Sequence, residues 1–126
     1  MNLFHMEQTK FTPEVFLDPE KMEMKFIGKS YPENAFEFYM PILDWIHEFF
    51  QKKNHETIKV NFEIVYFNSS SSKVFFDIFD LFEEAQADGS HIVINWIYDS
   101  DNDTAEEAGE DFRDDFENLT INLIGK

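Results

Sequence analysis

The spacing of apolar residues changes its period at a run of four serines, Ser69 to Ser72, in the middle of the chain. Before the run, residues 57–67 alternate apolar and polar side chains, a pattern typical of a half-buried strand. After it, residues 70–86 carry apolar side chains at helical spacing, with acidic side chains on another face. A strand that leads directly into an amphipathic helix indicates an α/β fold. One serine must therefore occupy or adjoin the helix N-cap, where backbone N–H groups are free.

The N-terminal third of the chain predicts a hairpin followed by a helix. Residues 11–18 and 22–26 are expected to pair across a turn at Pro19. Ser30 and Glu33 have the spacing of a capping box, which predicts that a helix begins there. The helix is expected to bury one apolar face and to bend or divide at an internal proline. The members of that face are Phe36, Tyr39, Leu43, Ile46 and Phe50, and the proline is Pro41.

The C-terminal half continues the alternation of strands and helices. Residues 91–98 are apolar on both faces except for Asn95, which predicts a strand covered on both sides. A third helix is expected from about Thr104 to Phe116, and a final strand over residues 119–124. The element order β-β-α-β-α-β-α-β predicts one α/β domain over residues 1–126, with four or five strands and about three helices. The turns that leave the strands are where such a sheet usually places its functional residues.

The composition restricts the partners that this chain can have. Its 26 acidic and 10 basic residues give a net charge of −16, which disfavours nucleic acid and anionic membranes because both would repel it. A basic protein partner is expected instead. Apolar residues make up 43% of the chain and include 16 Phe, so the core should be aromatic and part of the surplus should face a partner. Without cysteine, a leader pattern or a long apolar run, we predict a soluble cytoplasmic protein.

The acidic turn after residues 91–98 is a weak candidate for a metal site. Asp99, Asp101 and Asp103 are followed by Glu107 and Glu110 at the spacing of a twelve-residue calcium loop. The sixth position lacks the glycine that such a loop needs, and the loop follows a strand rather than a helix. A small acidic ligand-binding or metal-binding module remains the alternative function, and a solvated acidic turn is the simpler interpretation.

No motif in the sequence supports catalysis or a cofactor. The histidines His5, His47, His55 and His91 share no metal-ligand spacing, so ordinary surface positions are expected for them. No nucleophile elbow or phosphate-binding glycine loop occurs, and carboxylate pairs arise by chance in so acidic a chain. Trp45 and Trp96 lie on apolar patterns and are predicted to be core. We therefore expect a protein that is not an enzyme.

The serine run itself has two interpretations. It is either a capped turn or a phosphorylation switch, since a phosphoserine at a helix N-terminus meets free N–H groups and the positive end of the helix dipole. Three motifs in order resemble the SiaC family of bacterial regulatory phosphoproteins over nearly the whole chain. They are Ser30-Tyr31-Pro32-Glu33-Asn34, then Tyr66-Phe67-Asn68-Ser69-Ser70-Ser71-Ser72-Lys73, then Trp96-Ile97-Tyr98-Asp99 with Gly109-Glu110-Asp111-Phe112.

This resemblance implies a fold like the STAS domain of anti-sigma-factor antagonists, with a mixed sheet. It implies phosphorylation by an ATP-dependent Ser/Thr protein kinase and dephosphorylation by a PP2C-type phosphatase. It also implies that the unmodified form activates a GGDEF-type diguanylate cyclase, which raises cyclic di-GMP and favours biofilm. The acceptor implied is Ser69, where a family member has threonine, and Ser70 is the second choice. The residues predicted to bind the partner are Tyr66, Asn68, Ser70, Ser71, Lys73 and Phe76.

Overall fold

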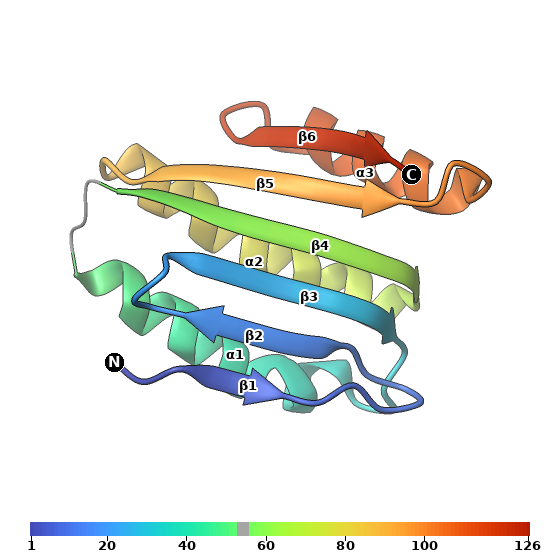
Figure 1. Cartoon of the computed structure of the whole chain (residues 1–126), viewed down its shortest axis with the longest axis horizontal. Coiled ribbons are helices and arrows are strands. Elements are labelled where there is room, and N and C mark those ends of the chain that lie inside the picture. Colours follow the sequence, from blue (N-terminus) through green and yellow to red (C-terminus); the bar gives the residue numbers. More distant parts are fainter. Residues whose placement is uncertain (53–55) are drawn as a thin grey trace.

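The computed structural model describes residues 1–52 and 56–126 and contains three helices and one sheet (Figure 1). In chain order the elements are β1 (Phe4–Met6), β2 (Glu14–Asp18), β3 (Glu23–Ser30), α1 (Ala35–Gln51), β4 (Thr57–Phe67), α2 (Ser69–Ala87), β5 (His91–Tyr98), α3 (Asp103–Asp115) and β6 (Thr120–Gly125). The α/β class, the three helices and the mixed sheet confirm the predicted fold. The sheet has one strand more than predicted.

The strands lie in the sheet in the same order as in the chain, from β1 to β6. The pairs β1/β2 and β2/β3 are antiparallel, and β3/β4, β4/β5 and β5/β6 are parallel. Each parallel connection contains one helix, so the carboxyl ends of β3, β4 and β5 lie at the same edge as the N-termini of α1, α2 and α3 (Figure 1, right). The predicted hairpin of β2 and β3 is confirmed. The short edge strand β1 was missed because three residues are too few to establish a period.

All three helices lie on one face of the sheet (Figure 1). Successive parallel connections step across the sheet in one direction, and right-handed connections of this kind must all lie on the same side. The prediction that β5 is covered on both sides is therefore wrong. Its second face is half-buried and carries Asn95, whose side chain donates to Asn61 at 2.9 Å and accepts from Asn122 at 3.2 Å. This amide ladder links three strands on the open face.

Helix α1 begins later than the predicted capping box. Asn34 is the N-cap, and its side-chain oxygen accepts from the N–H of Glu37 at 3.0 Å. Ser30 is instead the last residue of β3 and is fully buried. The helix also runs through Pro41 without dividing.

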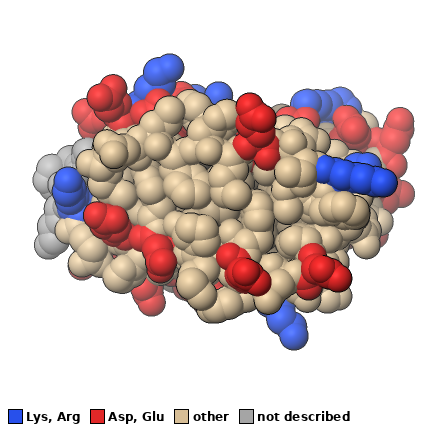
Figure 2. Space-filling model, turned by 90° about the horizontal axis from the view of Figure 1, so that it is seen from below, with Lys and Arg blue, Asp and Glu red and all other residues tan. Residues whose placement is uncertain are grey.

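The buried face of α1 is rotated from the prediction, because it follows Ala35, Ile42 and Phe49 as well as Tyr39 and Ile46. Phe36 and Met40 are consequently exposed, at 57% and 44%. Figure 2 looks onto the side of the molecule that carries β1 and α1, where the centre is largely uncharged and acidic and basic side chains lie around it. Part of the apolar surplus thus faces solvent.

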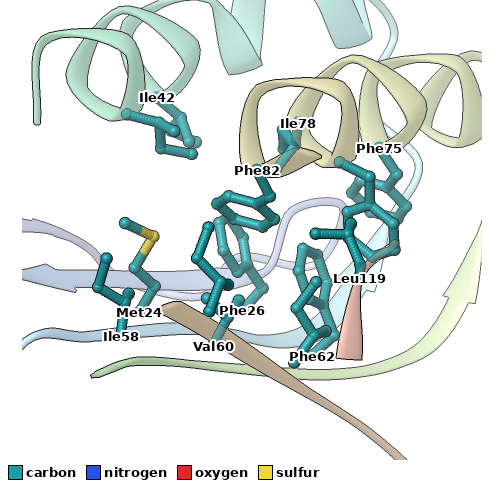
Figure 3. Packing of buried hydrophobic residues seen from close by; sticks show 14 of the residues in the cluster. Met24, Phe26, Ile42, Ile58, Val60, Phe62, Phe75, Ile78, Phe82 and Leu119 are labelled. Atoms are coloured by element: carbon teal, nitrogen blue, oxygen red, sulfur yellow. The ribbon is translucent and has the colours of Figure 1, made fainter. Parts of the chain in front are cut away.

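The core lies between the sheet and the helices, and it is aromatic as predicted. Phe62 of β4 is at its centre: its ring stacks on that of Phe26 with centroids 4.4 Å apart, and it meets Phe75, Phe79 and Trp96 at 5.3–5.9 Å. Figure 3 shows Phe26 and Phe62 rising from the strands toward α2. Trp96 is buried as predicted, whereas Trp45 is only partly buried. This packing fixes the position of α2 on the sheet.

Candidate functional site

The serine run lies where β4 ends and α2 begins. Asn68, rather than a serine, is the N-cap, and its side-chain oxygen accepts from the N–H of Ser71 at 2.9 Å. Its backbone carbonyl accepts from the N–H of Ser72 at 3.0 Å. Ser69 adjoins the cap as the first residue of the helix, as the sequence allowed. A group on its side chain lies close to the positive end of the helix dipole.

The four serines differ in their access to solvent. Ser69 and Ser70 are exposed, Ser72 is partly buried, and Ser71 is 0% exposed. This difference follows from helical geometry, because Ser71 shares the face of Phe75 and Ile78 that packs on the sheet. A kinase can therefore reach Ser69 and Ser70 in the folded protein. The prediction that Ser71 contacts a partner is wrong, since it has no exposed surface.

Ser71 instead belongs to a buried chain of hydroxyl groups. Its Oγ donates to the backbone carbonyl of Ser30 at 2.9 Å, and the Ser30 Oγ donates to the Ser71 Oγ at 2.7 Å. The hydroxyl of Tyr39 lies 2.6 Å from the Ser30 Oγ and is left as the donor to it. Burial raises the pKa of Tyr39, so this hydroxyl keeps its proton. The network ties the first turn of α2 to β3 and α1.

We expect Ser71→Ala to lower the free energy of unfolding by about 1–3 kcal/mol, because it leaves the buried Ser30 hydroxyl without its acceptor. Urea unfolding followed by circular dichroism measures this loss. The exposed neighbour supplies the control, since Ser70→Ala should change the free energy by less than about 0.5 kcal/mol. Equal effects of the two substitutions would contradict the assigned network.

A row of three aromatic rings, two of them exposed and one partly buried, lies at the same edge of the sheet. Tyr66, at the end of β4, is 55% exposed, and its ring centroid lies 5.5 Å from that of Tyr31. The Tyr31 ring in turn lies 5.3 Å from that of Phe11, which is 50% exposed. The prediction included Tyr66 but missed the other two rings. The sequence gives little indication that these two rings approach Tyr66, because Tyr31 lies in a family motif and Phe11 lies in a predicted strand.

A groove of about 820 Å³ opens beside these rings, between α2 and α3. Tyr66 and Phe76, both predicted to bind a partner, line it together with Ser72. Ser69, Ser72 and Phe76 share one side of α2, because their spacing is three and four residues. Phe76 is 37% exposed and rests on Phe112 of α3. The predicted residues Lys73 and Ser70 are exposed but do not line the groove.

The acidic turn, a weak candidate for a calcium loop, does not form one in the described residues. Asp99 and Asp101 border a polar hollow with Asp103, but α3 already begins at Asp103. Glu107 and Glu110 are therefore held in a helix, where the spacing of a coordinating loop no longer applies. In residues 1–52 and 56–126, no three His, Asp or Glu side chains are grouped as metal ligands. The described residues therefore do not support the calcium-loop form of the alternative function.

The described histidines lie apart from one another and from the serine run. His5 pairs with Glu14 at 3.1 Å across β1 and β2, His47 contacts Gln51 on α1, and His91 is exposed at the start of β5. His55 lies outside the described residues. No helix of the described part of the chain has the length and apolar character needed to cross a bilayer.

Residues 6–126 match the model of a family described as SiaC family regulatory phosphoprotein. An uncharacterized protein of Pseudomonas aeruginosa (strain UCBPP-PA14) is 33% identical over 115 residues, which cover 91% of this chain and 90% of that protein. A solved structure of SiaC of Pseudomonas aeruginosa superposes with a TM-score of 0.90 at 29% identity, over all of both chains. A further match, with a TM-score of 0.90 at 30% identity, covers 98% of this chain and 99% of a chain from the structure of the diguanylate cyclase SiaD in complex with its activator SiaC.

Proposed function

Because this chain belongs to the SiaC family of regulatory phosphoproteins, we propose that its unphosphorylated form binds and activates a diguanylate cyclase, and that phosphorylation of Ser69 releases the enzyme. The observation that carries the proposal is the likeness, along almost the whole chain, to SiaC, an activator seen in complex with the cyclase SiaD. In this proposal the chain is a regulator in the cytoplasm and not an enzyme. A Ser/Thr protein kinase and a PP2C-type phosphatase set its state.

The position of Ser69 supports its role as the acceptor. Its hydroxyl is exposed, and it stands on the side of α2 that continues through Ser72 and Phe76 into the groove. Ser70 is also exposed, but helical geometry turns it by about 100° toward Lys73 and Asp77, away from the groove. We take the docking surface to be the groove lined by Tyr66, Ser72 and Phe76, together with the neighbouring ring of Tyr31. A phosphate on Ser69 lies closer to this surface than a phosphate on Ser70.

The surface around Ser69 explains how a phosphate can act as a switch. The exposed ring of Tyr66 and the partly buried ring of Tyr31 lie at this edge of the sheet. A partner that covers them excludes water from the neighbouring serine. A dianion there must lose its hydration when the partner docks, at a cost of several kcal/mol unless it finds new partners. The modified protein should consequently release the cyclase.

Co-purification from the native host tests the proposal. We expect a GGDEF protein to co-purify with the unphosphorylated chain, and its synthesis of cyclic di-GMP to rise severalfold when the chain is added. Tyr66→Glu should abolish the rise because it places a charge in the docking surface. The matched control is Lys59→Glu on the open face of the sheet, which should leave activation unchanged. The proposal would be contradicted if no GGDEF protein bound the unphosphorylated parent chain, or if its synthesis of cyclic di-GMP did not rise.

A further inference from the structure

We propose that the groove between α2 and α3 binds a segment of the partner that presents a large apolar side chain flanked by lysine or arginine. This inference rests on the proposed function, because it names the partner chemistry that the docking surface accepts. It concerns the groove itself and not the region around Ser69.

The floor of the groove is apolar and partly open to solvent. Val65 is 48% exposed and Phe76 is 37% exposed, and Ala108 and Phe112 line the groove from α3. Phe76 packs against Phe112 with ring centroids 5.1 Å apart, so it is held in place rather than free to fold inward. A large apolar side chain that enters the groove removes this surface from water.

The rim of the groove on α3 is acidic. Its carboxylates are those of Glu107, Asp111, Asp114 and Asp115. Of the described residues that line the groove, none is lysine or arginine, and none of the four rim carboxylates is in a salt bridge within residues 1–52 and 56–126. Basic side chains on either side of an inserted apolar group would meet these carboxylates.

The rim carboxylates are arranged unfavourably for α3 by itself. Glu107, Asp111 and Asp115 repeat every four residues, and like charges at that spacing repel each other on a helix. Asp114 and Asp115 also lie in the last turn, where the helix dipole favours cations. Cationic side chains of a partner would reduce both the repulsion between these carboxylates and their unfavourable interaction with the helix dipole. A second copy of this chain, with 26 acidic and 10 basic residues, is poorly suited to do so.

The acidic rim and the phosphoacceptor act at different places on the surface. Ser69 and Phe76 are seven positions apart in α2, which corresponds to roughly 10 Å along the helix. At physiological salt the Debye length is about 8 Å, so a phosphate on Ser69 contributes little to the attraction at the far end of the groove. The rim therefore selects a basic partner, while the phosphate acts at the aromatic end.

Three synthetic peptides of equal length test the inference by titration into the 15N-labelled protein. The first carries a central leucine and phenylalanine flanked by lysine and arginine, the second has glutamate flanks, and the third has basic flanks around a central serine. We expect only the first to bind measurably, to shift the amide signals of Val65, Phe76 and Ala108, and to weaken as salt rises.

Paired charge variants provide the control for the acidity of the whole protein. Asp111→Asn with Asp114→Asn should weaken binding of the first peptide roughly tenfold. Asp77→Asn with Asp80→Asn removes the same charge from the side of α2 that faces α1, so it should weaken binding less than twofold. Thermal unfolding verifies that both double variants are folded.

Four outcomes would overturn the inference: no binding of the first peptide, equal binding of the first two peptides, shifts that lie outside the groove, or equal losses in the two double variants. The cyclase assay separates this inference from the proposed function. If the chain activates the cyclase and the Asp111→Asn, Asp114→Asn variant activates it equally, the groove assignment fails and the function stands. If the peptide result holds and no cyclase is activated, the proposed function fails alone.

Discussion

Phosphorylation of Ser69 is expected to weaken binding of the diguanylate cyclase by about 100-fold or more. The modification adds about −1.5 to −2 charges at the start of α2, near the exposed ring of Tyr66 and the partly buried ring of Tyr31. Desolvating that group on docking costs several kcal/mol, and roughly 2.7 kcal/mol already corresponds to a factor of 100 in affinity. Titration calorimetry with the unmodified protein and with protein of intact mass increased by one phosphate measures the difference.

Substitutions at the two exposed serines test the same prediction without the kinase. Ser69→Ala should bind the cyclase as tightly as the unmodified chain and should gain no phosphate at this site. Ser69→Asp should bind more weakly, though less so than the phosphoprotein because it carries one negative charge. Ser70→Ala is the matched control, since it should remain sensitive to the kinase. A phosphate mapped to Ser70, or equal binding by the two Ser69 variants, would refute the assignment.

Gly109→Ala is expected to lower the free energy of unfolding by about 2 kcal/mol through overpacking. A Cβ at this position of α3 would lie 2.5 Å from Cδ1 of Trp96 and 2.7 Å from Cδ2 of Leu123. The indole has little room to move, because its Nε1–H donates to the Ala105 carbonyl at 2.8 Å and its ring packs against that of Phe112. One of these contacts must be lost when the methyl group is added.

The sign of the Gly109→Ala effect makes the test decisive. At an open helical site, alanine would stabilise the helix by about 1 kcal/mol relative to glycine. Urea unfolding should show destabilisation instead, whereas Asp114→Ala, which removes a carboxylate from an exposed position in the last turn of the same helix, should not lower the free energy of unfolding. A stabilised Gly109→Ala protein would show that α3 does not rest on Trp96 as described.

Local patterns in the sequence were sufficient for most of the elements. The bounds predicted for β4 agree with the structure, and those of α2 and α3 agree within one residue at each end, because long alternating or helical patterns report which side chains face the core. The capping box was wrong for a different reason. Ser30 has the right spacing to cap α1, but its hydroxyl bonds to Ser71, which is 41 residues away in the chain.

The candidate site was predictable only in part. The position of the serine run at the start of a helix followed from the change of period. Phe76 belonged to the aromatic excess of that helix, and Tyr66 belonged to the family motif. Tyr31 and Phe11 were missed, because their approach to Tyr66 depends on where the loop between β1 and β2 and the end of β3 lie relative to β4. The acidic rim of the groove was also missed, because its carboxylates belong to α3 and lie beside α2 only in the folded protein.

The sequence by itself determined that a strand gives way to a helix at four hydroxyl groups in a strongly acidic chain, since hydrophobic period and charge are local properties. The tertiary structure alone decided which of those hydroxyls faces solvent, which face of the sheet the helices cover, and which side chains border the groove. These outcomes depend on contacts between segments far apart in the chain, and no local period reports such contacts.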